Sequence, residues 1–189
     1  MKPDRILLMK CLRLGIPFGM QGSLIALSCI ALQSVINRFG ENVIAAFAAT
    51  SRIEQLVQQP YNSLGTAVAT FTAQNLGAGN IERVKRGYQR STMLVVVFSL
   101  VMCGAMFLWG GPFVGIFVDD AEVIAIGGRA IRITSLFYIP LGMIYVARSL
   151  LNGAGDSFFA FANGLAEVVG RIGFSLGLAA IPALGYWAV

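Results

Sequence analysis

Two long stretches of this sequence contain no charged side chain, residues 14–37 and residues 91–118. A helix needs roughly 20 apolar residues to cross the hydrocarbon core of a bilayer, so each stretch can span one. Residues 55–81 and 172–189 also lack charges. The pattern predicts an all-α integral membrane protein, a polytopic helical bundle in which the few deep charges are the informative residues.

The composition agrees with this class and argues against an enzyme. Charged residues make up 12% of the chain, against roughly 25% in a soluble domain. Histidine, the commonest metal ligand and general base, is absent. The three cysteines are dispersed, and no phosphate-binding glycine loop ends in Lys-Ser or Lys-Thr. We therefore expect no catalytic residues, no cofactor-binding residues and no metal site.

Turn residues and apolar runs divide the chain into one bundle with a short surface helix. Gly40, residues 110–112 and residues 152–155 are the predicted turns between spans. Residues 81–90 carry apolar side chains on one face and basic ones elsewhere, which predicts an amphipathic helix in the headgroup layer. Five spans are predicted, at about 14–39, 42–76, 90–117, 121–152 and 157–181.

The loop charges predict an orientation. Basic residues crowd the N-terminal arm and the 77–90 connection, and Arg148 flanks the 152–156 turn. The opposite side carries the acidic residues Asp119, Asp120 and Glu122. The positive-inside rule then places the N-terminus in the cytoplasm of a multi-pass plasma (cell inner) membrane protein. The net charge of +5 thus reflects orientation at the lipid bilayer, and no nucleic-acid partner is expected.

Arg52 and Glu54 lie deep in the second predicted span, roughly 15–18 Å from its start. Gln55 follows Arg52 on one face, and Gln58 follows Glu54 on another. Pro60 comes next and predicts a kink. A charge at this depth costs about 2.5–3.5 kcal/mol, so it persists where it faces a cavity or a partner. Two interpretations remain open, a polar cavity lining and helix–helix contacts without a transport role.

The fifth span carries a second polar stripe. Asn163, Glu167 and Arg171 follow one another at four-residue intervals, and Glu167 precedes Arg171 in the favourable order for a helical ion pair. The pair could line a pathway or could simply neutralise itself. Tyr138, in the fourth span, could pack or contact a ligand. Pro140 beside it predicts a kink in that span. The candidate substrate or ion pathway residues are Arg52, Glu54, Gln55, Gln58, Tyr138, Asn163, Glu167 and Arg171.

Several motifs together resemble one family. They are Leu14-Gly-Ile-Pro17 at the start of a span, Gly40-Glu41 followed by Ala45-Ala-Phe-Ala-Ala49, and Pro60 followed by Gln74-Asn-Leu-Gly-Ala-Gly79. The last is echoed by Leu151-Asn-Gly-Ala-Gly-Asp156, and the echo predicts either two glycine turns without further meaning or a repeated helix pair, as in transporters built from internal repeats. These motifs resemble the multidrug and toxic compound extrusion (MATE) family, over nearly the whole chain and in the register of its C-terminal lobe.

The resemblance implies part of a two-lobe, twelve-helix antiporter for multidrug (xenobiotic) efflux that works by alternating access. Such proteins exchange small cationic or amphipathic substrates for a coupling ion, H⁺ or Na⁺. The partner would be an N-terminal lobe or other second half, and the chain would be a fragment of a longer one. Some family branches hold an acidic residue in the first and fourth spans of this lobe. Here those spans hold Gln21, Gln33, Asn37, Tyr138 and Tyr145, so that cation site is not carried over.

Two other functions stay open. A lipid-linked oligosaccharide flippase of related architecture would need a broad, strongly cationic cavity, whereas Arg52 and Arg171 are nearly balanced by Glu54 and Glu167. A non-transporting membrane assembly subunit would have all its deep polar groups paired in helix contacts.

Overall fold

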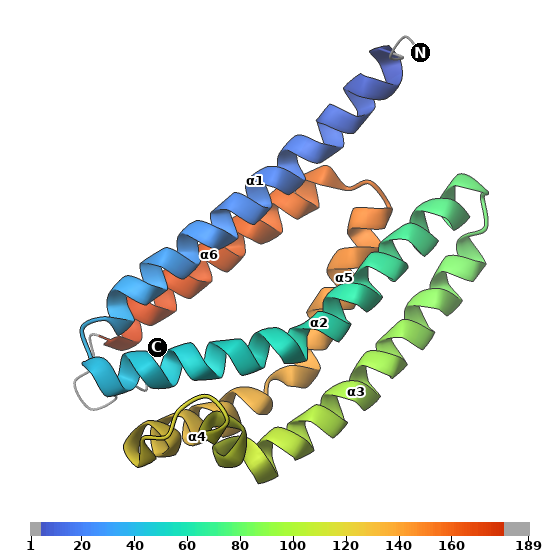
Figure 1. Ribbon diagram of the computed structural model, residues 1–189. Coiled ribbons are helices and arrows are strands. Elements are labelled where there is room, and N and C mark those ends of the chain that lie inside the picture. Colours follow the sequence, from blue (N-terminus) through green and yellow to red (C-terminus); the bar gives the residue numbers. More distant parts are fainter. Residues whose placement is uncertain (1–4, 180–189) are drawn as a thin grey trace.

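The computed structural model describes residues 5–179, and this range is almost entirely helical (Figure 1). The end of the fifth predicted span, residues 180–181, lies outside the described residues. The helices are α1 (Arg5–Ile36), α2 (Glu41–Gly77), α3 (Ile81–Gly115), α4 (Ala121–Ser135), α5 (Tyr138–Gly153) and α6 (Ser157–Ala179).

The helices form two groups. α2, α3, α4 and α5 pack together and contain the buried apolar core, which includes Ile53, Val95, Ile131 and Val146. α1 instead packs along α6, and both run in the same direction (Figure 1). Among the described residues, the main contacts that join the pair to the core group are sparse ones of α5 with α6 and of α1 with α2. We call α1 with α6 the outer pair and α2–α5 the core bundle.

The fourth predicted span is two helices. α4 ends at Ser135, α5 begins at Tyr138, and their axes differ by 55°. Pro140 explains the break, because it has no backbone N–H to donate to the carbonyl of Leu136. Sequence reasoning anticipated a kink from this proline but not an interruption. The α2 ribbon changes direction near its middle (Figure 1), where Pro60 lies, and stays helical throughout.

Two predicted boundaries in the third helix are wrong. Residues 81–90 are the first turns of α3 and not a separate surface helix, because no proline or glycine pair separates them from the span. The predicted turn at residues 110–112 lies inside the same helix, which continues to Gly115. Near Pro112 the helix has a local kink, where the backbone of Trp109 is not helical, with φ −116° and ψ 16°. The turn itself occupies residues 116–120.

The two echoed glycine motifs form equivalent turns. Gly79 and Gly155 both adopt positive φ, at 72° and 80°, which ends the preceding helix. Asn80 then accepts a hydrogen bond from the N–H of Arg83 (3.2 Å), and Asp156 accepts one from the N–H of Phe159 (2.9 Å). Two similar motifs therefore build the same helix–turn–helix connection.

The helix directions agree with the grouping of charges. The start of α1, the α2–α3 turn and the α5–α6 turn lie toward one end, and the α1–α2 and α3–α4 turns toward the other (Figure 1). By length and composition, α1 from Cys11 to Ile36 and α3 can each cross a membrane, and α4 with α5 qualify together as one bent span. The count of five spans stays a prediction, as does the cytoplasmic N-terminus.

Candidate functional site

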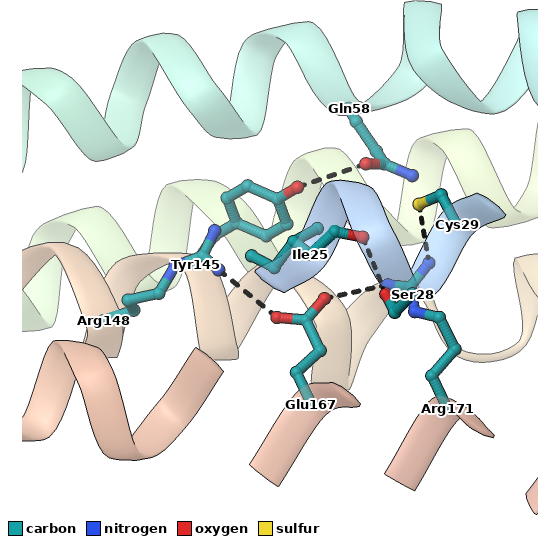
Figure 2. A network of polar contacts seen from close by, with 8 residues as sticks. All are labelled: Ile25, Ser28, Cys29, Gln58, Tyr145, Arg148, Glu167 and Arg171. Atoms are coloured by element: carbon teal, nitrogen blue, oxygen red, sulfur yellow. Dashed lines mark hydrogen bonds and ion pairs between the residues drawn. The ribbon is translucent and has the colours of Figure 1, made fainter. Parts of the chain in front are cut away.

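A chain of polar contacts connects the core bundle to the outer pair (Figure 2). It runs from Gln58 on α2 through Tyr145 and Arg148 on α5 to Glu167 on α6, and then through Arg171 to the outer pair's other helix. The contact that crosses from α5 to α6 is ionic. Since these two helices otherwise touch little, this contact is a principal link between the two groups.

Glu167 lies between two arginines. Its Oε1 accepts from Nη2 of Arg171 at 2.8 Å, which confirms the predicted pair one helical turn apart. Its Oε2 lies 3.8 Å from Nη1 of Arg148. Each carboxylate oxygen of Glu167 therefore contacts a different guanidinium group. Arg171 also donates to the Sγ of Cys29 on α1, at 3.5 Å, so the pair is not the isolated, self-neutralised unit that the sequence allowed.

Arg148 is oriented by an aromatic ring, and its guanidinium donates no hydrogen bond to the described residues. Its guanidinium carbon lies 4.8 Å from the centre of the Tyr145 ring, a cation–π contact. The Tyr145 hydroxyl in turn donates to Oε1 of Gln58, at 3.1 Å. Helices α5 and α6 thus bring two arginines toward one carboxylate.

The second feature of the site is an exposed polar stripe along α2. Its members recur every three or four residues and are all exposed. They are Arg52, Gln55, Gln59, Asn62, Thr66 and Thr70. From first to last they rise about 27 Å at 1.5 Å per residue, close to the hydrocarbon thickness of a bilayer. Sequence reasoning found its beginning and stopped at Pro60, although the same spacing continues beyond the proline.

Glu54 lies on the opposite, inward side of α2. It is half-buried and faces the Thr134 side chain of α4, close to Tyr138 of α5. Tyr138 is buried, and its hydroxyl has no hydrogen-bond partner among the described atoms. The structure therefore gathers Glu54 and Tyr138 inside the core bundle, next to the α4–α5 break.

The predicted residues thus separate into three places. Gln58, Glu167 and Arg171 join the polar chain, Glu54 and Tyr138 lie at the helix break, and Arg52 and Gln55 lie on the exposed stripe. Asn163 is half-buried one turn before Glu167, and no side-chain hydrogen bond is found for it within the described range. Sequence reasoning missed the roles of Arg148 and Cys29, because both depend on which helices become neighbours.

A separate cavity of about 610 Å³ lies at the other end of the bundle, between the α1–α2 turn and the start of α4. Glu41, Glu122 and Arg129 are among its lining residues, and Asn42 donates to Glu122 at 2.8 Å.

Comparison with known proteins identifies the fold and the family. The sequence profile of the family described as MatE matches residues 17–175. The "Probable multidrug resistance protein YoeA" of Bacillus subtilis is 30% identical over 155 residues, covering 82% of this chain and 34% of that protein. The "FAD transporter" of Shewanella oneidensis is 24% identical over 136 residues, 72% of this chain and 30% of that protein. The chain therefore spans about a third of the length of these relatives.

Solved structures agree. The outward-facing conformation of a multidrug resistance MATE family transporter superimposes with a TM-score of 0.91 at 21% identity, covering 100% of this chain and 43% of that one. A MATE structure in complex with MaL6 gives 0.90 at 21% identity, with 43% of that chain covered. Proteins of this family are multi-pass membrane transporters and not enzymes. With its profile match across most of the sequence, the chain belongs to the multidrug and toxic compound extrusion family.

Proposed function

We propose that this chain forms one lobe of an efflux antiporter of the plasma membrane. In the proposal, the second half of the transporter faces α2, and the two lobes enclose a cavity near the middle of the bilayer. Small amphipathic compounds would leave through it in exchange for H⁺ or Na⁺, as the lobes rock between inward-open and outward-open states. The relatives named for multidrug resistance support export.

The observation that carries the proposal is the exposed polar stripe of α2. Thr66 and Thr70 donate to carbonyls of their own helix, each at 3.0 Å. The other four side chains, Arg52, Gln55, Gln59 and Asn62, are costly against lipid, where nothing satisfies them. They are stable beside water or beside another protein surface. A transport pathway supplies the water, whereas an assembly subunit would supply the protein surface.

Accessibility to a water-soluble thiol reagent separates these cases. Single cysteines at Gln55, Gln59 and Asn62 should react with a charged methanethiosulfonate in the two-lobe transporter and lose dye efflux, and transported dye should slow the reaction. Cysteines at Val97 and Val101, exposed apolar residues of α3, are the matched controls and should stay unreactive. A stripe as unreactive as these controls would favour the assembly subunit.

Glu54 is the proposed proton- or sodium-coupling group, because it is a half-buried carboxylate beside the α4–α5 break. Glu54→Gln should strongly reduce efflux driven by a proton or sodium gradient while leaving the folded yield nearly unchanged. Glu82→Gln is the control, because Glu82 is exposed and, within residues 5–179, forms an ion pair with Arg86 alone, at 3.7 Å. Equal losses of yield and efflux in Glu54→Gln would instead assign the carboxylate a structural role.

The flippase alternative is not favoured. The deep charges on the described helices include three arginines, Arg52, Arg148 and Arg171, against two glutamates. This small excess is local and does not create the broad cationic cavity that a pyrophosphate headgroup requires.

A further inference from the structure

The polar chain contains one positive charge without a counterpart. Arg148 and Arg171 share the single carboxylate of Glu167, and no other acidic side chain of residues 5–179 forms an ion pair with either. Arginine is not deprotonated in proteins, so a change of pH within the physiological range does not remove the excess. The side chains of the two arginines are only 20% and 33% exposed.

Arg148 is the less satisfied of the two. Its contact to Glu167, at 3.8 Å, is too long for a hydrogen bond, and its guanidinium donates no hydrogen bond within the described part of the chain. A planar guanidinium presents five N–H groups that match a carboxylate or a phosphate. The Tyr145 ring holds this plane in place at 4.8 Å, so little side-chain entropy remains to be lost when an anion binds.

A second guanidinium lies beside it. Arg171 contacts the other carboxylate oxygen of Glu167, at 2.8 Å. Figure 2 shows the Glu167 carboxylate between the Arg148 and Arg171 side chains. An anionic group placed here would receive hydrogen bonds from the two guanidinium groups and would neutralise the excess charge.

We infer that Arg148, assisted by Arg171, binds the anionic group, a carboxylate or a phosphate, of an anionic or zwitterionic amphipathic substrate. The inference rests on the proposed transport function and names a substrate class for it. Glu167 occupies the site in the empty protein. An arriving anion competes with Glu167 for Arg148 and so loosens the contact that joins the outer pair to the core bundle.

Binding of two dyes of similar shape and opposite charge tests the inference. Fluorescein carries a carboxylate, whereas rhodamine 123 has an ester in its place and a cationic ring system. Fluorescence anisotropy of each dye is measured with the full chain in phosphatidylcholine nanodiscs. Fluorescein should bind more tightly, and Arg148→Gln should weaken it about tenfold, as the loss of a charged hydrogen bond does.

Matched variants sharpen the test. Glu167→Gln should tighten fluorescein binding several-fold by removing the competing carboxylate, and Arg90→Gln, an exposed arginine of α3, should change nothing. Arg148→Lys keeps the charge without the planar fork and should bind with intermediate affinity. It serves as the test if the glutamine variant does not fold. Equal binding of the two dyes, or equal effects of Arg148→Gln and Arg90→Gln, would overturn the inference.

Anionic lipid is the other source of such a group. If phosphatidylglycerol in the nanodisc displaces fluorescein from the wild type, and native mass spectrometry shows that it is retained through Arg148, the ligand is a lipid headgroup and the substrate assignment is wrong. The dye result does not depend on a second lobe. If the dye test fails, the proposed function is therefore not affected, because the efflux and thiol tests decide it separately.

Discussion

Replacing Glu167 by glutamine should destabilise the chain more than replacing either of its arginine partners. The change leaves Arg148 and Arg171 with like charges and no carboxylate between them. Breaking a buried ion pair costs about 3–5 kcal/mol, whereas an exposed pair contributes about 0.2–1 kcal/mol. The three side chains are 20–33% exposed, so an intermediate loss of about 1–2 kcal/mol is expected.

The order of the variants distinguishes a shared carboxylate from a simple pair. Arg171→Gln leaves Glu167 with Arg148, which lies 3.8 Å away, so its loss should be smaller than that of Glu167→Gln. The double variant Glu167→Gln with Arg171→Gln leaves one lone arginine and should be more stable than Glu167→Gln alone. A loss of about 1–2 kcal/mol corresponds to roughly 2–8 °C in a chain of this size.

Size-exclusion chromatography of the detergent-solubilised full chain after heating measures this order through the midpoint of monomer loss. The Arg90→Gln variant controls for the charge change alone. Strictly additive losses in the double variant would show that Glu167 and Arg171 do not interact, and would refute the arrangement. A loss in Arg171→Gln as large as that in Glu167→Gln would mean that Arg148 does not share the carboxylate.

Three further predictions follow from packing and topology. Gly153→Ala should cost about 1–3 kcal/mol in thermal stability, because its new methyl group would overlap the backbone of Ala69, whereas Gly104→Ala, with open space around it, should be neutral or slightly stabilising. Ser99→Ala should cost about 1–3 kcal/mol in the same assay, since it leaves a buried tyrosine hydroxyl and a carbonyl without their partner. A cysteine at Arg86 in a cysteine-free background should be labelled by an impermeant reagent only from the cytoplasm, and labelling from outside would invert the topology.

Local features of the fold followed from sequence because they depend on neighbouring residues. Gly40 has φ 95° at the start of α2, as its position between two apolar runs suggested. Asp156 directly precedes α6 and caps it, and the i, i+4 spacing of Glu167 and Arg171 predicted their ion pair. In each case the helix itself sets the distance between the interacting groups.

Features that depend on which helices meet were not accessible in this way. Arg148 was interpreted as a charge flanking a turn, yet the turn after α5 brings α6 back beside it. The weak points at Pro112 and Pro140 were recognised, but a proline only removes a hydrogen bond. Packing decides whether the helix continues. α3 continues past Pro112 where Gly110 lies against Gly128 of α4, whereas α5 starts anew near Pro140.

The division into a core bundle and an outer pair has a consequence for movement. The buried apolar cluster lies wholly in α2–α5, and the outer pair meets this bundle through sparse contacts and an ionic link. In lipid, apolar burial does not drive helices together, so the association of the two groups depends on polar contacts and close packing. A change in the partners of Glu167 therefore alters the contact that opposes separation of the groups. An anion at Arg148 would release α6, whereas loss of Arg171 would keep the contact of Glu167 with Arg148 and remove the bond from α6 to Cys29 of α1.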